Sequence, residues 1–204
     1  RQTWRNFLDV MVTSPAINLP DQLRVSAEQF QQFTQANPEL RMELTAQGKI
    51  IFMSPTGSEG GSRNAEASAD IVFWNRQTGL GKVFDSSSGF QLPNGAIRSP
   101  DTAWIAKERW ESLTPEQHRG FAPICPDFVL ELASESDSIR VLKSKMGEYI
   151  VNGDRLGWLI VPKARWVEIY RPDQSVERLD EPTTLSGETV LPGFLMPVDT
   201  IFRS

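Results

Sequence analysis

The chain has 204 residues, 39% of them hydrophobic and 23% charged, which is enough for one globular domain with its own core. Its 21 basic and 26 acidic residues leave a formal net charge of −5, which argues against a broadly basic nucleic-acid-binding surface but leaves room for a local basic groove. With one cysteine and one histidine, an internal disulfide and a sulfur- or imidazole-rich metal site are excluded, so a bound metal ion would be held mainly by oxygen.

Composition also suggests where the protein works and how the chain is divided. The single cysteine, Cys125, fits a reducing compartment, and we expect a cytoplasmic protein. No run of 18 apolar residues exists, so neither a membrane-spanning helix nor a membrane partner is expected. The polar, proline-containing residues 1–25 predict an N-terminal arm, and residues 26–204 predict a single domain.

The first half of the chain predicts two helices separated by a hairpin. Ser26 and Gln29 have the spacing of a capping box, which marks a helix start. Alternating apolar and polar residues then predict paired strands. In chain order, the expected elements are a helix over 26–37, strands over 40–45 and 49–53, a Gly/Ser loop over 55–61 and a long helix over 62–78.

The second half predicts a sheet around a buried strand. Phe128–Leu132 is a nearly continuous apolar run, as expected for a central strand covered on both faces. The other expected elements are strands over 82–85, 89–92 and 101–105, short helices over 107–113 and after Thr114, a helix from Ser136 or Ser138 to about Val151, a strand over 156–161, edge strands over 165–170 and 175–179, and a tail with one short strand. Together these elements predict a mixed sheet with helices packed on it, an α/β or α+β domain.

Glu131 interrupts the apolar run and is the most informative position. A buried carboxylate costs several kcal/mol unless it is paired, hydrogen-bonded or bound to a metal ion. Asp127 and Glu131 share one face of their strand, and Asp101 begins another strand, so these carboxylates can converge as a magnesium site. The alternative is structural: Glu131 pairs with a lysine or arginine, Asp101 caps a turn, and Asp127 only starts its strand.

Two lysines lie on the helix that follows. The apolar stripe of this helix contains Leu142 and Met146, and Lys143 and Lys145 flank the stripe on opposite sides. Periodicity does not choose between them and, if anything, places Lys143 closer to the sheet. The structural alternative is that both lysines are solvated.

The order of these motifs resembles the PD-(D/E)xK nuclease superfamily and, within it, the Uma-type restriction endonucleases. Pro100-Asp101 is followed about thirty residues later by Glu131 on an apolar strand and then by a lysine-bearing helix. The resemblance covers roughly residues 25–200. It rests on Met42-Glu43-Leu44, Met53-Ser54-Pro55, Ser99-Pro100-Asp101, the stretch 126–134, the stretch 145–149 and Asn152-Gly153.

This resemblance implies a restriction-endonuclease-like core of a helix, three strands, a helix and a strand. The corresponding segments are 62–78, 82–92, 101–105, 128–132, 139–151 and 156–161. It also implies that Asp101 and Glu131 are metal ligands. The superfamily's usual lysine position, two residues after the glutamate, is Ala133 here, so the resemblance assigns the lysine to Lys145 on the next helix.

Other positions take weaker roles from the same resemblance. Glu43 matches a recurrent glutamate of the family and is expected near the same site. Glu66 is a weaker candidate on the long helix. Many family members carry a histidine near the start of that helix, where this chain has Asn64, which leaves the helix's part in the site open.

The implied activity is metal-dependent DNA endonuclease chemistry by Asp101, Glu131, Lys145 and Glu43, with Mg²⁺ or Mn²⁺ as cofactor and DNA as substrate. Phosphodiester hydrolysis requires an activated water and neutralised phosphate charge, which fits these residue types. Exposed edge strands and a two-stranded substrate favour a homodimer. The main alternative is an inactive nuclease-fold module for protein interaction or mobile elements. A two-carboxylate glycosidase would not explain the lysine.

Overall fold

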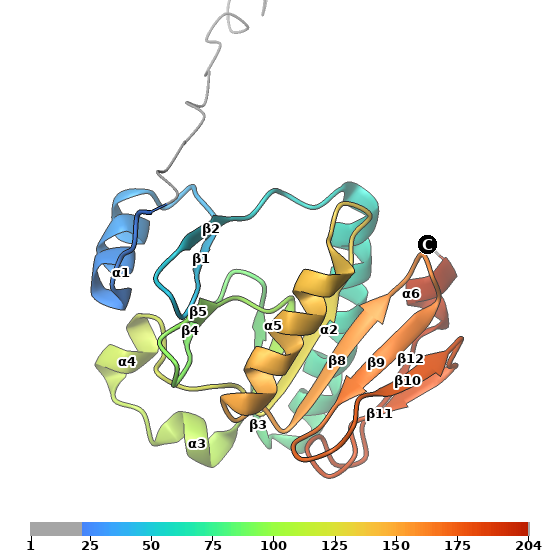
Figure 1. The fold of residues 1–204 in the computed structure, drawn as a ribbon. Helices are drawn as coiled ribbons and strands as arrows, with labels where there is room; N and C mark the ends of the chain where they lie inside the picture. The colour runs from blue at the N-terminus through green and yellow to red at the C-terminus, as the bar shows by residue number, and fades with distance from the viewer. Residues whose placement is uncertain (1–21, 204) are drawn as a thin grey trace, which may run out of the picture.

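The structure is a computed structural model that describes residues 22–203, and its largest element is a six-stranded mixed sheet (Figure 1). The strands of this sheet are β3 (Gly81–Asp85), β6 (Thr102–Ala106), β7 (Phe128–Leu132), β8 (Leu156–Val161), β9 (Trp166–Tyr170) and β10 (Glu177–Asp180). Their order is β10-β9-β8-β7-β6-β3. Only β7 and β8 are parallel, because a helical crossover joins them, and the remaining pairs are antiparallel.

Helices cover both faces of this sheet. In Figure 1, α5 (Ile139–Val151) lies in front of the sheet and α2 (Ser58–Thr78) lies behind it. On the face of the sheet that α2 covers, the core is completed by β11 (Thr184–Ser186), β12 (Leu195–Pro197) and α6 (Asp199–Arg203). Alternate residues of β7 therefore enter different cores: Leu130 packs with the α2 side and Val129 with the α5 side. Glu131 shares its strand face with Val129 and so points toward α5.

A second, four-stranded sheet has the order β2-β1-β5-β4. It consists of β1 (Met42–Leu44), β2 (Ile50–Phe52), β4 (Phe90–Gln91) and β5 (Ile97–Arg98). Helix α1 (Ala27–Ala36) packs against this sheet through Phe30, and its capping box from Ser26 to Gln29 is formed as predicted. Two short helices, α3 (Lys107–Glu111) and α4 (Pro115–Arg119), follow β6.

The expected α/β class with a mixed sheet is confirmed, and three details differ from expectation. Helix α2 begins at Ser58, so four of the seven residues of the expected loop over 55–61 form its first turn. Gly60 and Gly61 are poor helix formers, yet both are helical here, and a Cβ atom at Gly60 would lie 2.8 Å from Thr56 Oγ1. The segment 82–92, which the family resemblance assigns to the core, forms two strands that belong to different sheets: β3 lies in the six-stranded sheet and β4 in the four-stranded one. The tail contains a strand pair and a helix rather than one short strand.

Most of the predicted N-terminal arm lies outside the described residues. Within residues 22–203, no helix is both long and apolar enough to cross a membrane.

Candidate active site

Glu131 lies near the C-terminal end of β7, and its side chain is only 5% exposed. Its Oε1 atom is 2.8 Å from Lys145 Nζ and accepts a hydrogen bond of 3.1 Å from the Tyr149 hydroxyl. Lys145 and Tyr149 are one turn apart on α5, so both side chains reach the same point of the sheet. Both contacts use Oε1, and neither uses Oε2.

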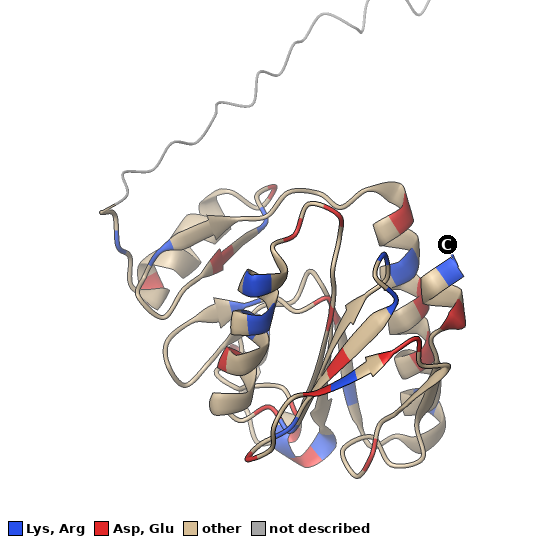
Figure 2. Cartoon of the chain, turned by 45° about the vertical axis from the view of Figure 1, so that its right-hand side comes forward, with Lys and Arg blue, Asp and Glu red and all other residues tan. Residues whose placement is uncertain are grey.

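Glu43 approaches the same lysine from the smaller sheet. Its Oε1 is 2.9 Å from Lys145 Nζ and accepts a 2.9 Å hydrogen bond from the Ser99 backbone N–H. Its Oε2 accepts a 3.0 Å hydrogen bond from Arg98 Nη1, and Arg98 also pairs with Glu148 of α5. The Lys145 ammonium therefore lies between two carboxylates that come from different sheets, and Figure 2 shows basic segments of α5 beside acidic strand residues.

Asp101 stands immediately before β6. Thr102 pairs with Leu130 in the antiparallel register of β6 and β7. One position further along, the same register places Asp101 opposite Glu131. Its Oδ2 accepts a 2.8 Å hydrogen bond from the Leu132 backbone N–H, and its Oδ1 accepts a 3.3 Å bond from the Asn64 amide of α2. The two expected metal ligands thus lie side by side at one end of neighbouring strands.

Burial and mutual charge set the protonation of this cluster. Burial raises the pKa of Glu131 to about 7, although Lys145 opposes the shift, while Asp101 and Glu43 add to it. Burial also raises the pKa of Asp101, against the Leu132 hydrogen bond and the charge of Lys145. For Glu43, burial alone would raise the pKa, but the charges of Lys145 and Arg98 outweigh burial and hold the pKa below the ordinary value.

The lysine itself is held in its charged form. Burial alone would lower the pKa of Lys145, but Glu131 and Glu43 outweigh that effect, so the pKa lies above the ordinary lysine value. Lys145 is therefore protonated at neutral pH, as a group that stabilises negative charge rather than one that accepts a proton.

The other expected candidates lie elsewhere. Lys143 leaves the opposite side of α5, contacts Glu168 of β9 and has a side chain that is 42% exposed. Asp127 precedes the other end of β7, where it accepts a hydrogen bond from the Ala106 N–H and pairs with Arg109, so its role is structural. Glu66 is exposed and has no hydrogen bond or ion pair among residues 22–203.

The structure adds Tyr149 and Arg98 to the candidates chosen from sequence, and it shows the part of Asn64, which the family resemblance left open. Tyr149 binds Glu131, Arg98 binds Glu43, and Asn64 binds Asp101. The spacing of Tyr149 from Lys145 was a usable signal, because residues four apart share a helix face. For Arg98, the one signal in the sequence was its position next to the Ser99-Pro100-Asp101 motif. Its contact with Glu43 is long-range and therefore leaves no local pattern in the sequence.

The donor atoms suit a hard cation. Within residues 22–203, no three His, Cys, Asp or Glu side chains are grouped as a metal site. The two carboxylates of Asp101 and Glu131 are nevertheless a suitable set for Mg²⁺, which keeps several waters and typically takes one or two carboxylates plus substrate phosphate oxygens. Glu131 Oε2, which takes no part in the lysine and tyrosine contacts, is the atom this role would use.

Comparisons with known proteins identify the fold and the family of this chain. A solved structure from Anabaena variabilis, described as "a putative nuclease belonging to DUF820", superimposes with a TM-score of 0.72 at 20% identity. The match covers 87% of this chain and 97% of that one, so the two share a fold. No curated protein matches this chain. The model of the Uma2 family, whose description is "Putative restriction endonuclease", matches residues 27–199. The chain therefore belongs to the Uma2 family of nuclease-fold proteins.

Proposed function

We propose that this protein is a metal-dependent DNA endonuclease whose active site contains Asp101, Glu131, Lys145 and Glu43. The observation that carries the proposal is the position of the Lys145 ammonium, 2.8 Å from Glu131 and 2.9 Å from Glu43, beside Asp101 at the strand ends. A lysine beside paired carboxylates matches what phosphodiester hydrolysis requires, in a chain whose family carries the description "Putative restriction endonuclease".

Each side chain has a defined task in this proposal. Asp101 and Glu131 would hold Mg²⁺ or Mn²⁺. Such a cation, when bound, supplies charge for the scissile phosphate and makes an attacking water more acidic. Lys145 orients that water and offsets the negative charge that builds up on the phosphate. Glu43 and Tyr149 are positioning residues, since they hold Lys145 and Glu131 rather than the substrate.

The test is a cleavage assay on supercoiled plasmid, linear duplex and single-stranded DNA with magnesium or manganese. We expect wild-type protein to nick or cut at least one of these substrates, and Asp101→Asn to reduce the rate by about 100-fold or more. Calorimetric titration with Mn²⁺ adds a readout besides activity: the wild type should bind the ion and Asp101→Asn should bind it much more weakly. Failure of both assays would contradict the proposal and favour an inactive interaction module.

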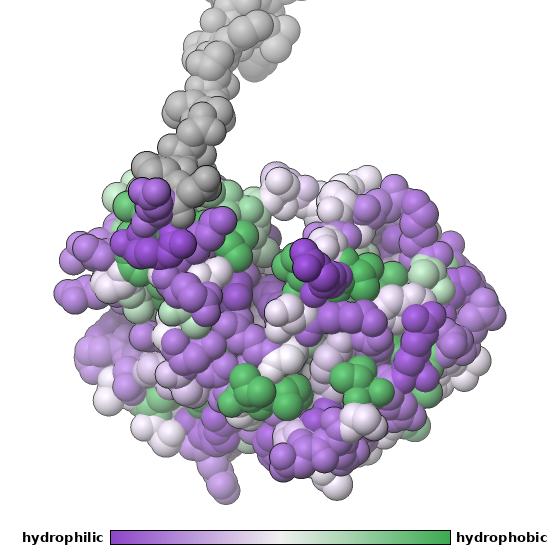
Figure 3. All heavy atoms as spheres, viewed as in Figure 1, coloured by the Kyte–Doolittle hydropathy of each residue, from purple (hydrophilic) through white to green (hydrophobic). Residues whose placement is uncertain are grey.

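The same proposal includes a homodimer. A duplex has two strands, and a two-fold symmetric enzyme presents one site to each. Large apolar side chains are exposed on one face: Val151, 83% exposed, at the end of α5, and Val176 just before β10. Figure 3 shows apolar atoms gathered over this end of α5 and beside the neighbouring strands. A second copy of the chain would cover this face.

A further inference from the structure

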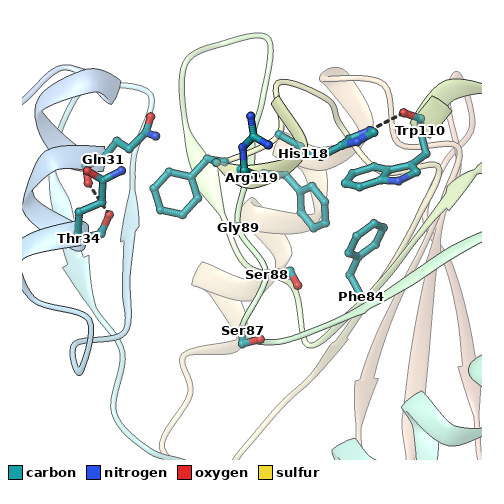
Figure 4. A pocket seen from close by; sticks show the side chains of 14 residues that line it. Gln31, Thr34, Phe84, Ser87, Ser88, Gly89, Trp110, His118 and Arg119 are labelled. Atoms are coloured by element: carbon teal, nitrogen blue, oxygen red, sulfur yellow. Dashed lines mark hydrogen bonds between the residues drawn. The ribbon is translucent and has the colours of Figure 1, made fainter. Parts of the chain in front are cut away.

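A cavity of about 310 Å³ lies between α1, the loop that joins β3 to β4, and α4 (Figure 4). Neither Asp101, Glu131, Lys145 nor Glu43 lines it, so it is separate from the candidate active site. Its volume is at the lower end of the range for small-molecule sites, about 300–1,000 Å³. The cavity therefore suits a ligand group as small as one aromatic ring system.

One wall of the cavity is aromatic. Trp110 stacks on His118 with ring centroids 4.2 Å apart, and Phe84 lies 4.9 Å from Trp110. Phe121 also lines the cavity and stacks on Phe30 behind it. The rings of Phe84, Trp110, His118 and Phe121 are partly exposed, whereas Phe90, which also lines the cavity, is buried. The other tryptophans of residues 22–203 are buried as well. Rings fixed in this way offer a stacking surface to a flat ligand.

The opposite wall is polar and comes from α1. Gln31 and Gln35 are one turn apart and line the cavity together with Thr34. Figure 4 shows Gln31 and Thr34 across the cavity from His118 and Trp110. Within the described part of the chain, the side-chain amides of Gln31 and Gln35 make no hydrogen bond. Glutamine amides pair with base edges and, in the best-known case, with the N6 and N7 atoms of adenine.

The cavity is coupled to the candidate active site through one pair of strands. Gly89 and Phe90 line the cavity, and Phe90 pairs with Arg98 of β5. Arg98 in turn binds Glu43, and Ser99 donates its N–H to the same carboxylate. These contacts connect one wall of the cavity to the carboxylate cluster, and the rim of the cavity carries the exposed side chain of Arg119, which pairs with Glu116.

From these observations we infer that the cavity binds one unstacked nucleobase of the DNA, adenine in preference to the others, next to the cleavage site. The inference rests on the proposed endonuclease function. Stacking on the aromatic wall provides binding energy, and the free amides of Gln31 and Gln35 provide the choice of base. A base in a continuous duplex is stacked and cannot enter, so the site favours bulged or single-stranded positions.

The test compares a labelled duplex that has one unpaired adenine with the fully paired duplex, by fluorescence anisotropy in calcium. We expect the bulged duplex to bind about tenfold more tightly to the wild type. Trp110→Leu removes the stacking surface, and the double variant Gln31→Ala/Gln35→Ala removes the amides from surface positions where folding is hardly affected. Either change should cut the preference to twofold or less while leaving binding of the paired duplex unchanged. Phe73→Ala, at a 65% exposed aromatic outside the cavity, is the matched control and should keep the preference.

The outcomes separate this inference from the proposed function. If magnesium-dependent cleavage occurs but the glutamine variant keeps the full preference, the base site is wrong and the nuclease stands. A preference that these variants abolish, in a protein that cuts no DNA, supports the base site and contradicts the nuclease. Adenosine monophosphate is the second probe: if it binds as tightly as the bulged duplex and competes with it, the cavity serves a free nucleotide and the inference about DNA is overturned.

Discussion

Lys145 shows how one side chain can serve both stability and chemistry. The sequence leaves open that Lys145 is a solvated lysine on the flank of its helix. In the structure its side chain is only 10% exposed and bridges two buried carboxylates. Removing one partner of a buried ion pair leaves an uncompensated charge, which is far more costly than losing a surface lysine.

We expect Lys145→Met to abolish most cleavage and to lower the free energy of unfolding at pH 7 by about 3–5 kcal/mol. Urea unfolding and the plasmid assay measure the two effects. Lys143→Met is the control: its ammonium is more exposed, and Glu168 keeps its hydrogen bond from Tyr170, so it should retain cleavage and lose less stability. Full cleavage by Lys145→Met, with loss in Lys143→Met, would show that the wrong lysine was assigned.

Glu131 makes stability depend on pH. Its pKa is about 7 in the folded protein, above the ordinary value of 4.5, because of burial. Between these values the folded state binds more protons than the unfolded state, so the free energy of unfolding falls as pH rises from about 4.5 to 7. Glu131→Gln removes this dependence. The difference in free energy of unfolding between the variant and the wild type should therefore shift by about 3 kcal/mol in favour of the variant as pH rises across that window.

Chemical denaturation at pH 5 and pH 8, without divalent cations, measures this difference. Adding magnesium to the wild type should restore stability at pH 8, since a cation favours the ionised carboxylate. A wild type and a Glu131→Gln variant with parallel pH profiles would contradict the raised pKa. An identical magnesium response in both would contradict the role of Glu131 as a ligand.

At the scale of elements, close backbone packing determines where β3 meets β6. A Cβ atom added at Gly81 would lie 2.2 Å from the Ile105 carbonyl oxygen and 2.5 Å from the Trp104 ring. Gly81→Ala must therefore push the first residue of β3 away from β6, and we expect a loss of about 2–4 kcal/mol in thermal or urea unfolding. Wild-type stability in this variant would show that the strand end shifts freely.

Gly147, in the middle of α5, gives the opposite expectation. A Cβ atom there meets nothing within 4 Å, and glycine is a poor helix former. Gly147→Ala should raise the free energy of unfolding by about 0.5–1 kcal/mol and leave cleavage unchanged. A loss of stability instead would indicate that α5 needs this glycine for a contact with another molecule.

At the scale of the whole molecule, the proposed homodimer has a direct test. The outer strand β10 carries Glu177, Arg178 and Asp180, and such charges discourage pairing of strand edges between copies. We therefore expect the exposed apolar face that includes Val151 and Val176 to form the interface. Analytical ultracentrifugation at micromolar concentration should show a dimer that Val151→Glu disrupts, and a monomer throughout would refute the proposal.

Much of the fold followed from local patterns in the sequence. The capping box at Ser26, the apolar run at Phe128–Leu132 and the helix ending at Val151 were predicted because each depends on neighbours in the chain. The pairing of Asp101 with Glu131 followed from the family resemblance and agrees with the strand register. Local patterns predicted two strands over 82–85 and 89–92 but did not reveal that they belong to different sheets, since sheet membership depends on distant partners.

By itself, the sequence predicted the α/β class from the periodicity of its elements. The order of its motifs, through the family resemblance, predicted that Asp101 and Glu131 converge and that the next helix carries the lysine. Periodicity did not distinguish Lys145 from Lys143; the family resemblance favoured Lys145, and the tertiary structure places it against Glu131 and Glu43. Both lysines flank the same apolar stripe, and the choice depends on which side of α5 faces β7 and β1. The tertiary structure also decided two long-range contacts. Arg98 is 55 positions from Glu43, and Asn64 is 37 positions from Asp101, so each pair meets only when the two sheets and α2 have packed together.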